Sequence, residues 1–205
     1  SASPAWLPDS NRLVITLRPD EIPHLALTDR EGTFLRVLTR DSGEDADPRP
    51  SPDGTMVAYV HWPDDDRNRR DIRIVDLASG ATRLLVGAPK SKDWFPRWSP
   101  DGKWIAFLSQ RTDYNQVWVI RPDGTDMRQV TDLGTNVEEF SWSPDGTRLA
   151  VIVNRRGRLD LAATSLTSGK TEEIKVGRGV YSRPQWSPDG ASIYVEYEDP
   201  LLPPD

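Results

Sequence analysis

Short apolar runs follow polar turns at regular intervals along this 205-residue chain. Each run is rich in aliphatic and aromatic residues, and the turn before it reads Pro-Asp-Gly, or Pro-Asp-Ser in the first copy. The five turn aspartates, separated by 44, 48, 44 and 44 residues, are Asp9, Asp53, Asp101, Asp145 and Asp189. A period of this length is typical of a repeat architecture, so it decides the fold class before any single residue does.

Each copy predicts a hairpin followed by a buried strand. Proline presets the first φ angle of a turn, aspartate accepts local backbone hydrogen bonds, and glycine adopts a positive φ without strain. The next strand is almost continuously apolar, which indicates burial on both faces. A second series of turns, at Gly32, Gly80, Gly124 and Gly169, separates two further strands in each copy. Four antiparallel strands per repeat form one blade of a β-propeller, so we predict an all-β propeller.

We predict a single propeller over residues 1–205 with four full blades and a partial fifth. The full blades lie at about 5–39, 49–86, 95–131 and 139–176, and the partial blade lies at 183–198. The tail at 199–205 is rich in proline and cannot supply two more strands. Such an array leaves two open sheet faces. We therefore expect these residues to belong to a longer propeller, and the alternative is self-association through the open blade edges.

The repeat resembles that of a known family. Residues 119–131, followed by Trp-Ser-Pro-Asp-Gly at 142–146, are similar to the WD-repeat-like propeller repeat of the TolB family. The motif also resembles the N-terminal propellers of prolyl oligopeptidase-type and acylaminoacyl-type peptidases. The resemblance covers nearly the whole chain and implies a propeller fold, whereas one blade motif serves many functions. The TolB resemblance further implies a periplasmic or otherwise extracytoplasmic location in a bacterium.

Composition and charge narrow the function classes. A formal net charge of −6 and a pI near 5.0 argue against a nucleic-acid-binding protein, which carries a basic face. The sequence has no apolar run of about 18 residues, so we predict no membrane span. The absence of cysteine excludes disulfides, a thiolate nucleophile and cysteine-ligated metals. Nothing in the sequence indicates a cofactor.

Candidate catalytic and metal-binding groups are few. The two histidines, His24 and His61, are predicted in strands or strand edges of different blades, and no motif supplies a serine partner for either. The segment Asp41–Asp47 is dense in carboxylates but lacks the ligand spacing of a calcium loop. We interpret it as a solvated loop, with a cation site as the alternative, and predict no metal. Ser168–Thr171 resembles the end of a phosphate-binding loop but precedes a predicted strand, so we interpret it as a hairpin turn.

The residues that recur in every copy are interpreted as structural. A tryptophan stands three residues before the turn aspartate in four of the five copies, and this fixed phase indicates packing between neighbouring blades rather than an aromatic binding site. Each turn aspartate stands alone in its turn, which favours turn stabilisation over metal binding. The structural repeat residues are Trp98, Asp101, Gly102, Trp142, Asp145, Gly146, Trp186, Asp189 and Gly190.

Loops of variable length form the candidate working surface. The two turn series are short and are predicted on one face, whereas the loops after each second strand and between blades vary in length on the other face. Their mixture of charged and aromatic residues suits a protein or peptide partner. The candidate partner-binding residues are Trp62, Asp93, Trp94, Tyr114, Asn136, Glu138, Arg178 and Tyr181.

Two basic groups lie in these loops, at residues 67–70 and 155–158. They could hold an acidic partner, but Asp64–Asp66 neutralise part of the first group, and a solvated loop is the favoured interpretation. We predict a non-enzymatic module that binds a protein or peptide. The alternative is the gating propeller of a prolyl oligopeptidase-type serine peptidase whose catalytic domain lies outside this chain.

Overall fold

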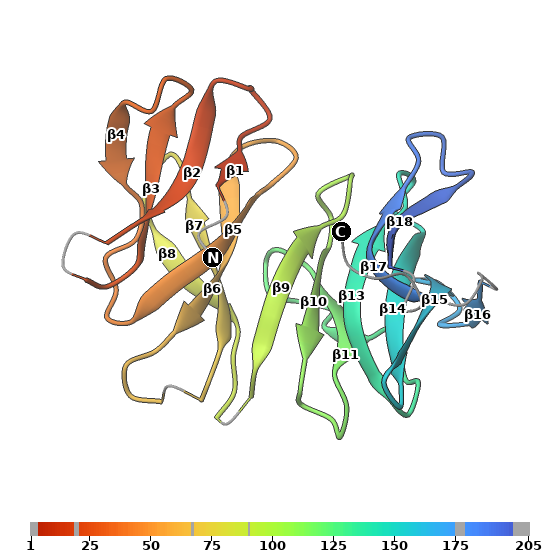
Figure 1. Ribbon diagram of the computed structural model, residues 1–205. Coiled ribbons are helices and arrows are strands. Elements are labelled where there is room, and N and C mark those ends of the chain that lie inside the picture. Colours follow the sequence, from red (N-terminus) through yellow and green to blue (C-terminus); the bar gives the residue numbers. More distant parts are fainter. Residues whose placement is uncertain (1–3, 19–20, 67, 90, 175–178, 199–205) are drawn as a thin grey trace.

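The computed structural model describes residues 4–18, 21–66, 68–89, 91–174 and 179–198. All regular secondary structure in these residues is β-strand, arranged as four four-stranded antiparallel sheets and one two-stranded sheet that follow one another in chain order (Figure 1). The predicted class, an all-β propeller with four full blades and a partial fifth, is confirmed.

The strands of each sheet are consecutive in the sequence. The first sheet contains β1 (Ala5–Trp6), β2 (Arg12–Leu17), β3 (His24–Asp29) and β4 (Phe34–Val37), and the second contains β5 (Glu44–Pro50), β6 (Met56–Trp62), β7 (Asp71–Asp76) and β8 (Thr82–Val86). The third contains β9 (Asp93–Trp98), β10 (Ile105–Ser109), β11 (Gln116–Ile120) and β12 (Arg128–Gln129). The fourth contains β13 (Asn136–Trp142), β14 (Arg148–Arg155), β15 (Arg158–Ser165) and β16 (Thr171–Glu173), and the fifth contains β17 (Val180–Trp186) and β18 (Ile193–Glu198). The first strand of a sheet contacts the first strand of a neighbouring sheet in the pairs β1 and β5, β5 and β9, and β13 and β17. We call these first strands the inner strands.

The Ser-Pro-Asp-Gly turns are held by the same hydrogen bonds in the second to fifth sheets. In the third sheet, the Ser99 hydroxyl donates to Asp101 Oδ1 at 2.7 Å and accepts from the Trp104 amide at 2.9 Å. The Gly102 amide donates to the Ser99 carbonyl at 2.9 Å, and the positive φ of 70° at this position suits glycine. The side-chain bonds recur at the equivalent serine and aspartate positions of the other three turns. The serine and aspartate therefore close each turn together.

Each turn also contacts the turn of the preceding sheet. A Cβ placed on Gly102 would lie 3.8 Å from Pro52 Cδ, and a Cβ on Gly146 would lie 3.7 Å from Pro100 Cδ. The glycine of one turn thus packs beside the proline of its predecessor. This contact gives the repeated Pro-Asp-Gly a role between blades, in addition to the turn geometry expected from the sequence.

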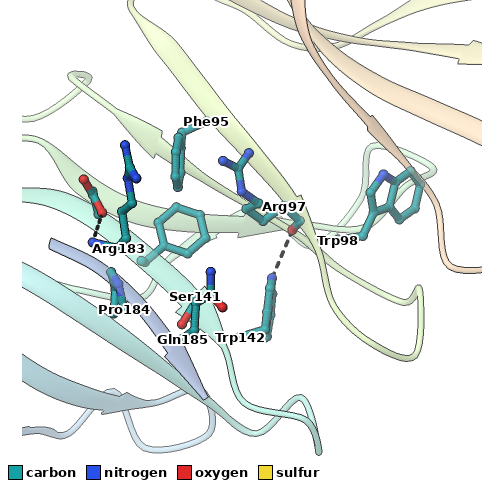
Figure 2. A pocket seen from close by; sticks show the side chains of 10 residues that line it. Phe95, Arg97, Trp98, Ser141, Trp142, Arg183, Pro184 and Gln185 are labelled. Carbon is teal, nitrogen blue, oxygen red and sulfur yellow. Dashed lines mark hydrogen bonds between the residues drawn. The ribbon is translucent and has the colours of Figure 1, made fainter. Parts of the chain in front are cut away.

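Two of the repeated tryptophans, Trp98 and Trp142, link neighbouring inner strands by a hydrogen bond, whereas Trp186 Nε1 is buried without one among the described residues. Trp98 Nε1 donates to the Arg49 carbonyl of β5 at 2.8 Å. Trp142 Nε1 donates to the Arg97 carbonyl of β9 at 3.0 Å (Figure 2). Trp98 is 9% exposed, whereas Trp6 in the first sheet is 55% exposed. The indole is therefore an interblade contact where a preceding sheet is present to receive it.

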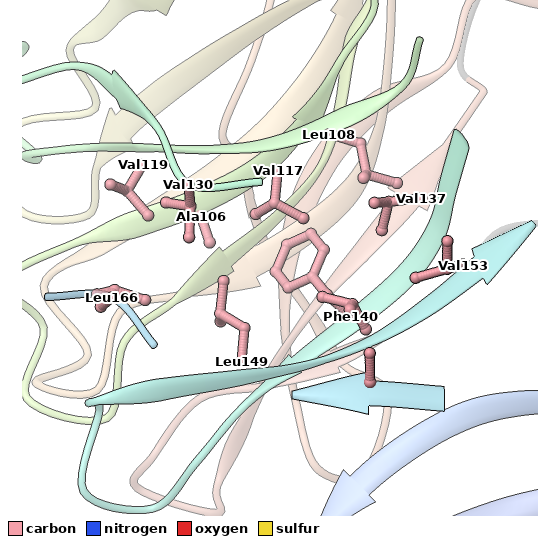
Figure 3. Packing of buried hydrophobic residues seen from close by; sticks show 12 residues of the cluster. Ala106, Leu108, Val117, Val119, Val130, Val137, Phe140, Leu149, Val153 and Leu166 are labelled. Atoms are coloured by element: carbon pink, nitrogen blue, oxygen red, sulfur yellow. The ribbon is translucent and has the colours of Figure 1, made fainter. Parts of the chain in front are cut away.

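The hydrophobic core lies between the sheets. Along β10, Ile105 and Phe107 pack toward the second sheet, whereas Ala106 and Leu108 pack toward the fourth sheet, where Val137 and others complete the cluster (Figure 3). Side chains alternate sides along a strand, so a strand between two sheets is apolar at every position. The predicted burial of these strands on both faces is confirmed.

The second blade begins earlier than the sequence indicated, because β5 starts at Glu44 inside the segment Asp41–Asp47. Asp45 is fully buried, with its Oδ1 at 2.8 Å from His61 Nδ1 and its Oδ2 at 3.5 Å from His24 Nδ1. The interpretation of this segment as a solvated loop is therefore wrong for Asp45. The strand register places Asp45 opposite His61, and the first sheet supplies the second imidazole.

Candidate functional site

The two faces of the array differ in their connections. The Leu77 amide, after β7, donates to the Thr55 carbonyl before β6 at 2.8 Å, and Leu166 and Thr147 make the equivalent bond in the fourth sheet at 2.9 Å. Both turn series therefore lie on one face. The connections between second and third strands, and between sheets, lie at the opposite strand ends, which we call the loop face.

A hollow of about 400 Å³ lies between the inner strands β9, β13 and β17, and we call it the axial groove (Figure 2). Phe95 and Arg97 line it from β9, Glu139 and Ser141 from β13, and Arg183 from β17. Phe95, Glu139 and Arg183 each lie three residues before the repeated tryptophan of their sheet, and Arg97 and Ser141 each lie one residue before it. The repeat therefore directs the same two strand positions of each blade toward the groove, while the residue types differ between blades.

The inner strands have an irregular backbone at the groove. Phe95 and Arg183 adopt positive φ values of 60° and 49°, as does Asp47 of β5 at 50°. A proline follows each of these residues, and the strand register shifts at the same place. Proline cannot donate to a ladder hydrogen bond, so the backbone bulges there. Positive φ in residues other than glycine is costly and concentrates at functional sites.

Charged and aromatic groups alternate around the groove. The Arg97 guanidinium lies 3.5 Å from the centre of the Phe95 ring, and its Nη1 lies 3.4 Å from Asp47 Oδ2. Burial lowers the pKa of Arg97 to about 10, against the opposing effect of Asp47, so the side chain is charged at neutral pH. Glu139 Oε2 accepts a hydrogen bond from the Arg183 amide at 2.6 Å. The groove is thus lined by two cations, a carboxylate and aromatic surface.

The partner-binding residues predicted on the loop face differ in their exposure to solvent. Tyr114 is exposed, whereas Asn136 and Glu138 are half-buried. Asn136 Oδ1 accepts from the Asn115 amide at 2.9 Å, and Glu138 Oε1 accepts from Asn154 Nδ2 at 2.9 Å, so both also hold neighbouring segments in place. Arg178 lies outside the described residues.

Asp93 and Tyr181 are not exposed, contrary to the expectation from the sequence. Asp93 is fully buried, and its carboxylate pairs with Arg111 at 2.9 Å and accepts from the Ser91 hydroxyl at 2.9 Å. Tyr181 is 5% exposed because it packs against Ile152 and its neighbours, between the fourth and fifth sheets. Both residues begin or nearly begin an inner strand, so the neighbouring sheet covers them.

Trp62 and Trp94 come from different sheets, and the structure joins them through Arg70, a member of the basic group at residues 67–70. The Arg70 guanidinium carbon lies 5.5 Å from the centre of the Trp62 ring and 5.8 Å from that of Trp94. Both aromatic residues are half-buried at the loop face. In the sequence, Arg70 is one of several arginines in a charged loop, and nothing there distinguishes it from the others.

No catalytic constellation is assembled in the part of the chain that the structure describes. His24 and His61 both face Asp45, and no serine hydroxyl is hydrogen-bonded to either imidazole there. The same residues contain no group of three or more His, Cys, Asp or Glu side chains placed to hold a metal ion. They also form no helix with the length and apolar character that crossing a membrane requires.

Residues 47–199 match the profile described as the TolB beta propeller domain. This match covers most of the chain. The chain belongs to the TolB β-propeller family. Within it, the chain is similar both to TolB proteins and to peptidases.

Three curated relatives illustrate this range. An uncharacterized protein of Agrobacterium fabrum is 32% identical over 160 residues, which cover 72% of this chain and 53% of that protein. A TolB homolog of Chlorobium luteolum is 31% identical over 141 residues (69% and 31%), and dipeptidyl-peptidase 5 of Porphyromonas gingivalis is 37% identical over 151 residues (64% and 21%). The chain therefore spans 21% to 53% of the length of these three relatives.

Solved structures share the fold. The putative TolB from Agrobacterium tumefaciens superposes with a TM-score of 0.76 at 24% identity, over 97% of this chain and 75% of that chain. Puromycin hydrolase superposes with a TM-score of 0.77 at 16% identity, over 98% of this chain and 38% of that chain. At these identities the likeness concerns the fold alone.

Proposed function

We propose that this TolB-family propeller is a non-enzymatic module that binds a protein or peptide partner through the axial groove and the adjoining loop face. The observation that carries the proposal is the groove itself. It combines paired charges and aromatic rings on backbone held in positive φ, with no catalytic group nearby among the described residues. Concave sites of this volume with a few fixed polar groups are typical binding sites.

The groove suits an extended peptide better than a compact small molecule. Its walls come from three successive inner strands, so it runs across blades rather than into one of them. Arg97 and Glu139 present opposite charges along this path, and Phe95 and Phe140 pack edge to face with ring centres 5.4 Å apart. Aromatic residues and arginine are enriched in protein-binding sites, and the groove contains both.

The experiment is a cross-linking pull-down with groove variants of the purified chain. Ser141→Trp places a large side chain in the groove, and Ser168→Trp places the same side chain in an exposed turn of the same sheet. We expect partners to be recovered with the wild type and with Ser168→Trp but lost with Ser141→Trp. Recovery of the same partners by both variants, with both folded by circular dichroism, would contradict the proposal.

A second function is favoured by the peptidases among the relatives. The propeller could form the gate of a serine peptidase whose catalytic domain lies elsewhere in the parent gene, as the identity to dipeptidyl-peptidase 5 suggests. The discriminating observation is the sequence of that gene. A Gly-x-Ser-x-Gly elbow downstream would favour the gating role over an independent binding module.

Two further proposals concern the location of the protein and its self-association. A periplasmic or other extracytoplasmic location is supported by family resemblance alone, and fractionation of the source cells tests it. Association of two copies through open blade edges is supported by exposed Tyr194 and Tyr197 on β18. A monomeric mass in light scattering at working concentration would exclude this association.

A further inference from the structure

Arg70 is an arginine held against two tryptophans from different blades. Its guanidinium carbon lies within 6 Å of the centres of both rings, Trp62 at the end of β6 and Trp94 in β9. Each such contact stabilises a cation over an aromatic face. Two contacts together restrict the side chain far more than one, so the guanidinium has a defined position at the loop face.

The backbone at Arg70 is fixed as well. Its amide donates to the Ser91 carbonyl at 3.2 Å, and its carbonyl accepts from the Asp93 amide at 3.0 Å. The segment before β7 therefore runs beside the segment before β9, where Arg70 and Lys92 form a parallel bridge. Arg70 is held at both ends of its side chain, by this bridge and by the two indoles.

Neighbouring arginines have carboxylate partners, whereas Arg70 has none among the residues that the structure describes. Arg69 makes a bidentate pair with Asp71, with Nη2 at 2.6 Å from Oδ2, and Arg111 pairs with Asp93 at 2.9 Å. For Arg70, no carboxylate of the described residues lies within ion-pair distance and none accepts a side-chain hydrogen bond. A cation–aromatic contact does not use up hydrogen-bond donors as a carboxylate partner does, so N–H groups of Arg70 stay available to an acceptor.

We infer that Arg70, Trp62 and Trp94 form a receptor for a carboxylate of the bound polypeptide, an Asp or Glu side chain with apolar neighbours. The planar guanidinium donates two parallel hydrogen bonds to a carboxylate, and the indoles supply apolar surface beside it. This inference deepens the proposed binding function and rests on it.

The acidic loop Asp64–Asp66 beside this receptor limits how much negative charge the ligand can carry. Asp64 and Asp65 are exposed. The hydrogen bond to Asp71 raises the pKa of the neighbouring Arg69, and the charges of Asp65 and Asp66 raise it further. A highly acidic segment would be repelled by this loop, whereas one carboxylate flanked by apolar residues gains the contact with little repulsion. Affinity then comes from direct contact rather than long-range attraction, so added salt weakens it only modestly.

The test uses two synthetic peptides that differ in one group, acetyl-Ala-Leu-Glu-Leu-Ala-amide and its Gln counterpart. Each is titrated into the ¹⁵N-labelled chain, and the side-chain N–H signals of Arg70, Trp62 and Trp94 are followed by NMR. Arg70→Gln removes the receptor cation. Arg128→Gln is the matched control, because Arg128 also lies over a tryptophan, 5.4 Å from the Trp104 ring, and has no ion pair among the described residues.

We expect the Glu peptide to shift all three signals and to bind at least about tenfold more tightly than the Gln peptide, as loss of a charge-assisted hydrogen bond implies. Arg70→Gln should lose the same factor, and Arg128→Gln should bind as the wild type does. Equal binding of both peptides, no binding of the Glu peptide, or unchanged binding by Arg70→Gln would overturn the inference. Groove-dependent partner recovery in the pull-down, together with any of these results, would leave the general binding function standing.

Discussion

Replacing Trp98 by alanine tests whether the repeated tryptophan joins the blades. Its ring is 9% exposed and packs in the cluster between the second and third sheets, which includes Ile74 and Phe107. Its Nε1 also donates to the Arg49 carbonyl of the preceding inner strand. The substitution therefore removes both packing and the hydrogen bond that spans the two sheets.

The magnitude follows from these two losses. Truncation of a buried aromatic side chain to alanine costs about 3–5 kcal/mol of the free energy of unfolding. Trp98→Phe keeps most of the ring burial and loses the hydrogen bond, so it should cost about 1–2 kcal/mol. Trp6 occupies the same repeat phase but is 55% exposed, and Trp6→Ala should change stability by no more than about 0.5 kcal/mol.

Equilibrium urea denaturation of the three variants, followed by far-UV circular dichroism, measures this series. The expected order of destabilisation is Trp98→Ala, then Trp98→Phe, then Trp6→Ala. A cost below about 1 kcal/mol for Trp98→Ala would show that the indole contributes little to the blade interface. An equal cost for Trp98→Ala and Trp6→Ala would show that the repeated tryptophan stabilises its own blade rather than the interface between blades.

Two further predictions concern carboxylates. Hydrogen bonds from the Ser143 hydroxyl and then the Thr147 amide lower the pKa of Asp145 from 3.8 to about 2, so the stability it supplies is complete above about pH 4 and is lost as the pH falls toward 2. Thermal unfolding should therefore show Asp145→Asn less stable than the wild type at neutral pH, with the difference shrinking over that acid range; a constant difference would contradict this. Asp45→Ala should cost about 1–3 kcal/mol in urea denaturation because it leaves buried His61 and half-buried His24 without their shared hydrogen-bond partner. Exposed Glu44→Ala should cost no more than about 0.5 kcal/mol; equal costs would place Asp45 outside the core.

The fold could be predicted from the sequence because its determinants are local and repeated. Ser99, Asp101 and Gly102 close their turn through bonds within six residues, so the motif reports the hairpin directly. The burial of Asp45 could not be predicted, because it depends on His24 from another sheet, and no period in the sequence connects the two.

The candidate site was predicted only in part, for the same reason. Loop composition indicated Trp62 and Trp94 as candidates, yet the residue that joins them, Arg70, becomes distinct only when the blades are placed side by side. Asp93 is expected in a loop from the sequence, but the inner strand β9 already begins at this residue and the side chain is buried.

Positions that change between otherwise equivalent blades locate function better than the positions that recur. The register that pairs buried Asp45 with His61 in the second sheet pairs Val137 with Val153 in the fourth. The same strand positions thus carry a hydrogen-bonded polar pair in one blade and an apolar pair in another, beneath the loop face. The recurring residues build the interfaces between sheets, and selection for a partner can act on the remaining positions without disturbing them. Arg70 is such a position, since it lies in a loop that the repeat leaves free to vary.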